Sequence, residues 1–142
     1  MPYAPLRLLL LFDTHGGLCG PLVPILRSQL EHRAFLVDTH PIQAGPIDIA
    51  PYAGLIVGIP VIHPRQPILH PRPRAFLDGL PLHGRPIAVF VVGRLWVGDT
   101  LQAARDDVVQ RGARLVAARA YRTWWMDTHD ESIADECMVR IR

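Results

Sequence analysis

The sequence predicts an α/β fold built on one doubly wound sheet of five parallel strands in the order 2-1-3-4-5. Five short, almost continuous apolar runs predict strands that are buried on both faces. Segments with the apolar spacing of helices lie between these runs, and such an alternation requires parallel crossover connections. Because 142 residues are enough for one such core, we expect residues 1–142 to form a single domain.

The N-terminal strand, loop and helix form the clearest local pattern. The apolar run at 6–12 predicts the first strand, the polar, glycine-rich stretch 13–20 predicts a tight loop, and the leucine spacing at 21–33 predicts an amphipathic helix. Pro24 is compatible with this helix because it falls near the first turn. Unpaired N–H groups at the start of a helix attract anions, so this order of elements favours a phosphate site.

The later elements continue the alternation. Helical apolar spacing predicts helices at 74–80 and 100–111, the second of which is followed by Gly112 as a stop signal. Apolar runs predict the four remaining strands at 34–38, 53–59, 86–92 and 114–121.

Two stretches depart from this regular pattern. Residues 60–73 contain five prolines and no helical spacing until their end, which predicts a loop. The tail predicts either a small helix at 132–136 or a terminal strand at 138–141. We therefore expect the last helix of the fold to be short or missing.

Composition excludes several classes of function. All 15 basic residues are arginines, so the chain has no lysine for a Schiff base or for a Walker phosphate loop. A net charge of +2, with the arginines scattered, does not favour nucleic-acid binding. The apolar run near the N-terminus is too short to span a membrane, so we expect no membrane span.

The cysteines and histidines do not form a metal-binding pattern. Cys19 and Cys137 lie far apart in the sequence and fit a reducing compartment, so we expect a cytoplasmic protein. His15, His40 and His63 would reach the same sheet edge, but their spacing has no metal signature and we expect no metal.

In a doubly wound sheet, ligands bind outside the carboxyl ends of the strands, where the strand order reverses between strands 1 and 3. The loops after strands 1, 3 and 4, at 13–20, 60–73 and 93–100, converge on this edge. The candidate site of this chain therefore lies among these three loops.

Three segments resemble parts of the flavodoxin family and of short flavodoxin-domain proteins. Residues 12–19 resemble the family's phosphate loop, 48–61 its third strand and the loop that covers the flavin, and 76–93 its passage from helix to fourth strand. The resemblance extends over 6–121. It implies the flavodoxin-like fold, FMN as cofactor, electron transfer or flavin-dependent redox chemistry, and a redox partner protein or a small electron donor.

The resemblance also implies where FMN would bind. In the phosphate loop Thr14 and Gly17 match the family, His15 and Gly16 replace two hydroxyl residues, and Cys19 stands where a threonine is usual. The flavin ring would lie between the loops at 60–64 and 93–99. The implied FMN-binding residues are Thr14, His15, Gly16, Gly17, Leu18, Cys19, Gly58, Ile59, Pro60, His63, Gly93, Arg94, Trp96 and Asp99.

Two other interpretations remain open on the sequence. In the first, the chain is a degenerate flavodoxin-like module without flavin that acts through protein contacts. An exposed sheet face with Tyr121, Trp124 and Trp125 would then favour a homodimer. Alternatively it is an FMN-dependent oxidoreductase, although no residue identifies a substrate or a catalytic group. We expect Cys19 to be a small buried residue and not a nucleophile.

Overall fold

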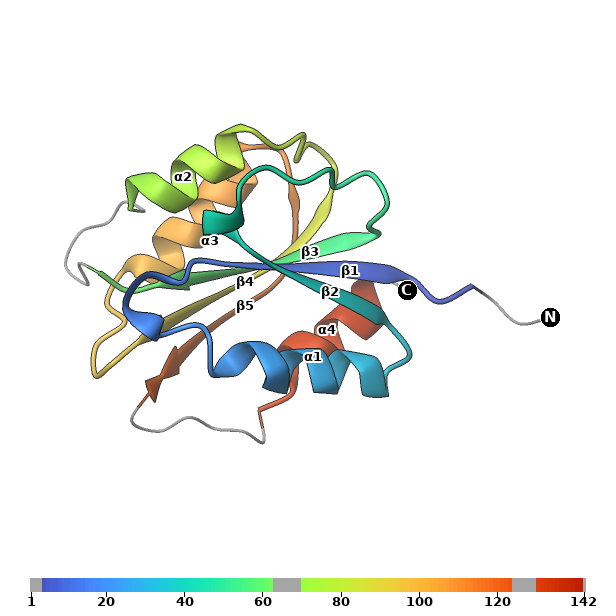
Figure 1. Ribbon diagram of the computed structural model, residues 1–142, viewed down its shortest axis with the longest axis horizontal. Coiled ribbons are helices and arrows are strands. Elements are labelled where there is room, and N and C mark those ends of the chain that lie inside the picture. The colour runs from blue at the N-terminus through green and yellow to red at the C-terminus, as the bar shows by residue number, and fades with distance from the viewer. Residues whose placement is uncertain (1–3, 63–69, 124–129, 142) are drawn as a thin grey trace.

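The structure, a computed structural model, describes residues 4–62, 70–123 and 130–141. Its centre is a five-stranded, all-parallel sheet with the order β2-β1-β3-β4-β5 (Figure 1), which confirms the predicted strand order. The strands are β1 (Arg7–Phe12), β2 (Leu36–Pro41), β3 (Gly54–Pro60), β4 (Pro86–Gly93) and β5 (Arg114–Arg122).

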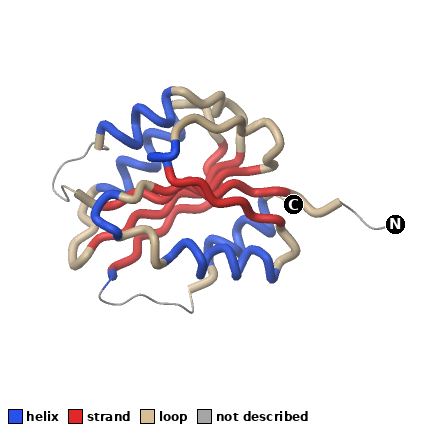
Figure 2. The backbone as a smooth tube through the Cα atoms, in the orientation of Figure 1, coloured by secondary structure: helices blue, strands red, loops and turns tan. Residues whose placement is uncertain are grey.

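Helices cover both faces of this sheet. Two lie on one face and two on the other, which gives three layers (Figure 2). The first pair is α1 (Leu22–His32) and α4 (Ser132–Arg140), and the second is α2 (Pro71–Asp78) and α3 (Thr100–Gln110). Two single-turn 3-10 helices, η1 (His15–Gly17) and η2 (Ile42–Ala44), follow β1 and β2.

Successive residues of each strand face opposite helical layers. In β1, Leu8 and Leu10 pack with α1 and α4, whereas Leu9 and Leu11 pack in the core on the side of α2 and α3. All four leucines are fully buried. A strand covered on both faces must be apolar at every position, which is why the sequence shows a continuous run there and not an alternation.

Helix α2 begins at Pro71, earlier than the predicted start at Arg74. The Nδ1 atom of His70 accepts a hydrogen bond from the N–H of Arg72 at 3.3 Å and so caps the helix. Proline in the first turn lacks only an N–H that the helix does not use. The prediction of a loop through Pro73 is therefore wrong for the last three residues of that stretch.

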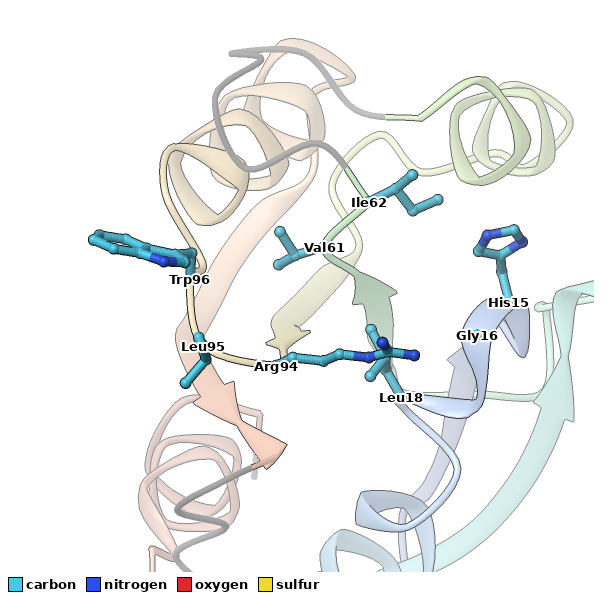
Figure 3. A pocket seen from close by; sticks show the side chains of 8 residues that line it. All are labelled: His15, Gly16, Leu18, Val61, Ile62, Arg94, Leu95 and Trp96. Atoms are coloured by element: carbon cyan, nitrogen blue, oxygen red, sulfur yellow. The ribbon is translucent and has the colours of Figure 1, made fainter.

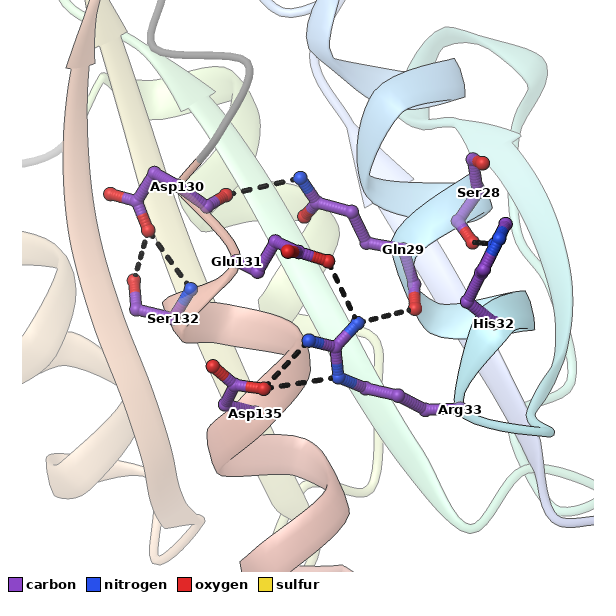
Figure 4. Close-up of polar contacts among 8 residues, drawn as sticks. All are labelled: Ser28, Gln29, His32, Arg33, Asp130, Glu131, Ser132 and Asp135. Atoms are coloured by element: carbon purple, nitrogen blue, oxygen red, sulfur yellow. Dashed lines mark hydrogen bonds and ion pairs between the residues drawn. The ribbon is translucent and has the colours of Figure 1, made fainter.

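The tail forms α4, so the last helix is short and the alternative of a terminal strand is wrong. Polar contacts hold α4 against α1 (Figure 4). Arg33 donates to Asp135 through Nε and Nη2, at 3.1 and 2.6 Å, and through Nη1 to Glu131 at 3.1 Å. Gln29 Nε2 donates to the carbonyl oxygen of Asp130 at 3.1 Å. Helix α4 thus covers the sheet face that the alternative without flavin requires to be exposed.

The tyrosine expected at a dimer contact is also covered. Tyr121 is buried, and its ring packs edge-on against Phe90 with 6.3 Å between the ring centroids. It therefore does not present the surface that the expected contact needs, and Trp124 and Trp125 lie outside the described residues.

In the part of the chain that the structure describes, no helix is long and apolar enough to cross a bilayer.

Candidate functional site

A pocket of about 430 Å³ opens at the carboxyl edge of the sheet, between the loops that follow β1, β3 and β4 (Figure 3). This volume lies in the range of small-molecule sites. The position is the one at which sheets of this strand order bind ligands. The lining residues are His15, Gly16, Leu18, Val61, Ile62, Arg94, Leu95 and Trp96.

Apolar side chains form much of the pocket wall, and one cation faces it. Leu18 comes from the first loop, and Val61 and Ile62 directly follow β3. The Arg94 side chain extends from the loop after β4 in the direction of Leu18 (Figure 3). Among the described residues no carboxylate pairs with Arg94. The pocket thus offers an apolar wall beside an unpaired cation, which suits an apolar ligand with an anionic group.

Trp96 forms the outer rim of the pocket. It is 74% exposed, and Figure 3 shows its indole turned away from His15. The turn that leads to it depends on Gly93, because a Cβ atom there would collide with the carbonyl oxygen of Trp96. Gly93 therefore shapes the loop that carries Arg94 and Trp96.

The start of α1 offers few donors to an anion. The N–H groups of Leu22 and Val23 donate to the carbonyls of the two residues that precede Pro21, at 3.0 and 3.2 Å. Pro21 and Pro24 have no N–H group. The sequence-based argument for a helix N-terminal phosphate site is therefore weakened by these two prolines.

Free backbone donors lie instead within the loop after β1. The N–H groups of Gly16, Cys19 and Gly20 have no hydrogen-bond partner among the described residues. Gly16 and Gly17 have φ angles of +70° and +66°, a left-handed conformation that favours glycine. These two glycines turn the backbone so that the loop closes after one 3-10 turn.

The head of the same loop is already occupied by side chains. The N–H of Thr14 donates to Gln43 Oε1 at 3.0 Å, and the N–H of His15 donates to Asp13 Oδ1 at 2.9 Å. Gln43 Nε2 also donates to Asp13 Oδ1. Asp13 is fully buried. Two donors that the sequence assigned to a phosphate are therefore engaged by side chains of the protein.

The first turn of α2 reaches this loop as well. The rings of His15 and His70 are stacked with 6.0 Å between their centroids. Arg72 Nη1 lies 3.6 Å from Asp13 Oδ1. The loops after β1 and β2 and the first turn of α2 thus meet around the Asp13 carboxylate.

Cys19 is fully buried, as expected. Burial and, second, the negative charge of Asp13 raise the pKa of the Cys19 thiol to about 12. The thiol stays protonated at neutral pH, and only a thiolate is an effective nucleophile. The arrangement therefore opposes nucleophilic chemistry at Cys19.

The structure brings one group of the predicted site residues together around the pocket. Thr14, Gly17 and Cys19 belong to the same loop but do not line the pocket. The predicted residues that line it are His15, Gly16, Leu18, Arg94 and Trp96.

The residues predicted in β3 lie in the interior. Ile59 and Pro60 are buried in the strand. A Cβ atom on Gly58 would collide with the ring of Phe90, so this glycine serves the packing of the sheet. Asp99 is exposed just before α3 and lies outside the pocket lining, and His63 lies outside the described residues.

Sequence reasoning did not select several residues of the site. Three apolar residues of the lining were missed: Val61, Ile62 and Leu95. Their position just after β3 and β4 could have indicated that they line the site. Gln43 gave no signal, because its role depends on how the loop after β2 folds back on the loop after β1.

The strand order and the helical layers define the flavodoxin-like α/β fold. No protein-family model and no curated protein match the sequence. Among solved structures, the chain is similar to oxidised flavodoxin 1 from Bacillus cereus, with a TM-score of 0.76 and 17% identity over 96% of this chain and 99% of that one. It is also similar to two-electron reduced Megasphaera elsdenii flavodoxin, with a TM-score of 0.80 and 12% identity over 93% and 98% of the two chains.

A third similar structure contains a ligand. It is Fusobacterium nucleatum flavodoxin bound to flavin mononucleotide, with a TM-score of 0.61 and 16% identity over 78% of this chain and 69% of that one. At these identities the likeness shows the fold, and the chain has the flavodoxin-like fold.

The pocket and the loop after β1 beside it fit two parts of FMN, the flavin ring and the phosphate. The wall of Leu18, Val61 and Ile62 suits the flavin ring, and the free N–H groups of the first loop, together with Arg94, suit its phosphate. The head of the loop does not contribute donors, because Gln43 and Asp13 engage them.

Proposed function

We propose that this protein binds FMN at the carboxyl edge of its sheet and takes part in electron transfer. The observation that carries this proposal is the combination, at one pocket, of an apolar wall, the Arg94 cation, which has no carboxylate partner among the described residues, and a first loop with free backbone donors, of which Gly16 lines the pocket. A flavin with a phosphate tail needs these three features in one site. The FMN bound to the Fusobacterium flavodoxin supports the same ligand for this fold.

Each part of the pocket has a role in this proposal. The N–H groups of Gly16, Cys19 and Gly20 hold the phosphate, and Arg94 supplies a charge-assisted contact from the facing loop. Val61 and Ile62 keep water from one side of the ring. Bound FMN supplies the reversible uptake of electrons, which the protein side chains cannot.

The open side of the pocket is where electrons would pass. Leu95 and Trp96 are exposed large apolar residues at this rim. In the proposal, a redox partner protein or a small electron donor reaches the flavin there. The predicted residues Gly58 and Gly93 act indirectly, because their missing side chains allow the packing and the turn that form the pocket.

A titration of the purified chain with FMN tests this proposal. We expect flavin absorption bands, quenched flavin fluorescence and a dissociation constant of about 1 μM or below. Leu18→Trp should fill the pocket and abolish binding, measured by ultrafiltration. Leu36→Trp, at an exposed leucine of β2, is the matched control and should bind like wild type. A folded protein that binds no FMN at about 50 μM would contradict the proposal.

The second candidate is a module without flavin that acts through protein contacts. One observation favours it: side chains already engage the N–H groups of Thr14 and His15 at the head of the loop. The same titration separates the two candidates, because this module leaves FMN free in solution.

A further inference from the structure

Asp13 places a buried carboxylate at the head of the loop that would hold a phosphate. We propose that this carboxylate is an internal anion that sets the selectivity of the flavin site. It competes with the phosphate of the ligand, so riboflavin, which has no phosphate, binds nearly as well as FMN. This inference rests on the proposed flavin site and concerns only its preference between the two flavins.

The Asp13 carboxylate accepts hydrogen bonds from groups that could otherwise donate to the anionic group of a ligand. Its backbone N–H donates to the carbonyl of Gly58 at 3.1 Å, which holds the residue at the end of β1. Its side chain is 0% exposed, and Oδ1 accepts from His15 N–H and from Gln43 Nε2. The other oxygen, Oδ2, has no hydrogen-bond partner among the described residues. Positive ends of N–H dipoles therefore already point at a negative charge here.

The charge of Asp13 is only partly offset by its neighbours. Among the described residues, Arg72 is the cation within ion-pair distance: its Nη1 lies 3.6 Å from Oδ1, and its side chain is 44% exposed. A buried charge that its partner neutralises only in part acts strongly on nearby charges, because the low-dielectric interior screens it little.

The field of this charge reaches the donors of the loop. Burial raises the pKa of the Cys19 thiol, and the charge of Asp13 raises it further. Cys19 also carries one of the free backbone N–H groups. A phosphate held by that group would stand in the same unfavourable field, whereas the uncharged tail of riboflavin would not.

A purely structural role for Asp13 would not need a charge. Asp48 makes a comparable contact on the surface, where its Oδ1 accepts the N–H of Ala50 at 3.0 Å. An asparagine oxygen can accept such a bond equally well. Replacing each aspartate by asparagine therefore separates the effect of charge from that of loop geometry.

The experiment measures dissociation constants for FMN and riboflavin by fluorescence quenching, on the full chain freed of any bound flavin. The variants are wild type, Asp13→Asn, Arg72→Gln and the control Asp48→Asn, each checked for folding by circular dichroism. Wild type should prefer FMN over riboflavin by no more than about tenfold. Asp13→Asn should raise this preference by at least about tenfold, Arg72→Gln should lower it, and Asp48→Asn should leave it unchanged.

Several results would overturn the inference. They are a wild-type preference for FMN above that limit, an unchanged or lower preference in Asp13→Asn, and a matching rise in Asp48→Asn. If Asp13→Asn does not fold, wild type and Arg72→Gln decide the question. Binding of both flavins with no effect of the variants would sink the inference and leave the flavin site standing, whereas binding of neither flavin would sink both.

Discussion

Gln43 Nε2 donates a hydrogen bond to Asp13 Oδ1 and ties the loop after β2 to the loop after β1. The same side-chain amide accepts the N–H of Thr14 at 3.0 Å. One glutamine thus bridges two loops whose residues lie far apart in the sequence. The shape of the candidate site depends on this bridge, because the loop after β1 lines the pocket with His15, Gly16 and Leu18 and carries the free backbone donors.

Replacement of Gln43 by alanine should loosen the loop. The N–H of Thr14 loses its acceptor, so its hydrogen exchange should become at least about tenfold faster. Global stability should fall by about 0.5–1.5 kcal/mol in urea unfolding. Gln102→Ala is the matched control, since Gln102 donates to Asp106 on the exposed face of α3. Unchanged exchange at Thr14 would show that the bridge does not order the loop.

Replacement of Arg94 by glutamine should weaken FMN binding. The cation is exposed and unpaired among the described residues, so its contact with a phosphate is worth about a fivefold change in affinity. Riboflavin affinity should change by less than about twofold. Arg105→Gln, on the exposed surface of α3, removes the same charge away from the pocket and should change neither. An equal loss for both flavins would place Arg94 at the ring and not at the phosphate.

Substitution of Gly58 should reveal packing and not a direct ligand contact. A Cβ atom at position 58 meets the ring of Phe90, so Gly58→Ala should cost about 1–3 kcal/mol of unfolding free energy. Adding Phe90→Leu to Gly58→Ala should recover part of this cost, because the smaller side chain makes room. A double-mutant cycle in urea unfolding measures the coupling, and additive effects would contradict the packing role.

Asp130 should contribute pH-dependent stability to the docking of α4. Burial raises the pKa of its carboxyl, but hydrogen bonds from Ser132 and Arg119 outweigh burial and hold the pKa below its usual 3.8. A lowered pKa in the folded state stabilises the protein above the unfolded value, and this stability is lost as the pH falls through the folded value.

Asp130→Asn should therefore lower stability at pH 7 by about 1–3 kcal/mol, and the difference from wild type should shrink toward pH 3. Urea unfolding at both pH values measures it. Glu31→Gln removes an exposed ion pair with Arg27 and should cost no more than about 0.5 kcal/mol. An Asp130→Asn deficit that persists undiminished below pH 3 would rule out the charge as its cause.

Much of the fold could be predicted because its determinants are local. The buried strands need apolar residues at every position, as Leu8 to Leu11 show, and this pattern is visible without coordinates. The start of α2 was not predicted, because it depends on a cap from His70 and on prolines that a helix tolerates only in its first turn. The length of α4 depends on contacts with α1 such as those of Arg33.

The site was less predictable than the fold. Strand order was enough to bring His15, Gly16 and Arg94 to one edge. The sequence did not reveal which backbone N–H groups of the loop are free, because this depends on where the Asp13 and Gln43 side chains lie in three dimensions. A glycine-rich loop in a sequence thus indicates room for an anion, whereas the free donors become known only from the folded loop.

Backbone amide NMR shifts during FMN addition test the central claim most directly, because they locate the ligand. We predict the largest changes at Gly16, Cys19 and Gly20. The amides of Gly54 and Gly84, which precede or begin strands at the opposite edge of the sheet, should stay unchanged. Saturation without changes at the loop after β1, or no shifts at all with excess FMN, would contradict a flavin site in this pocket.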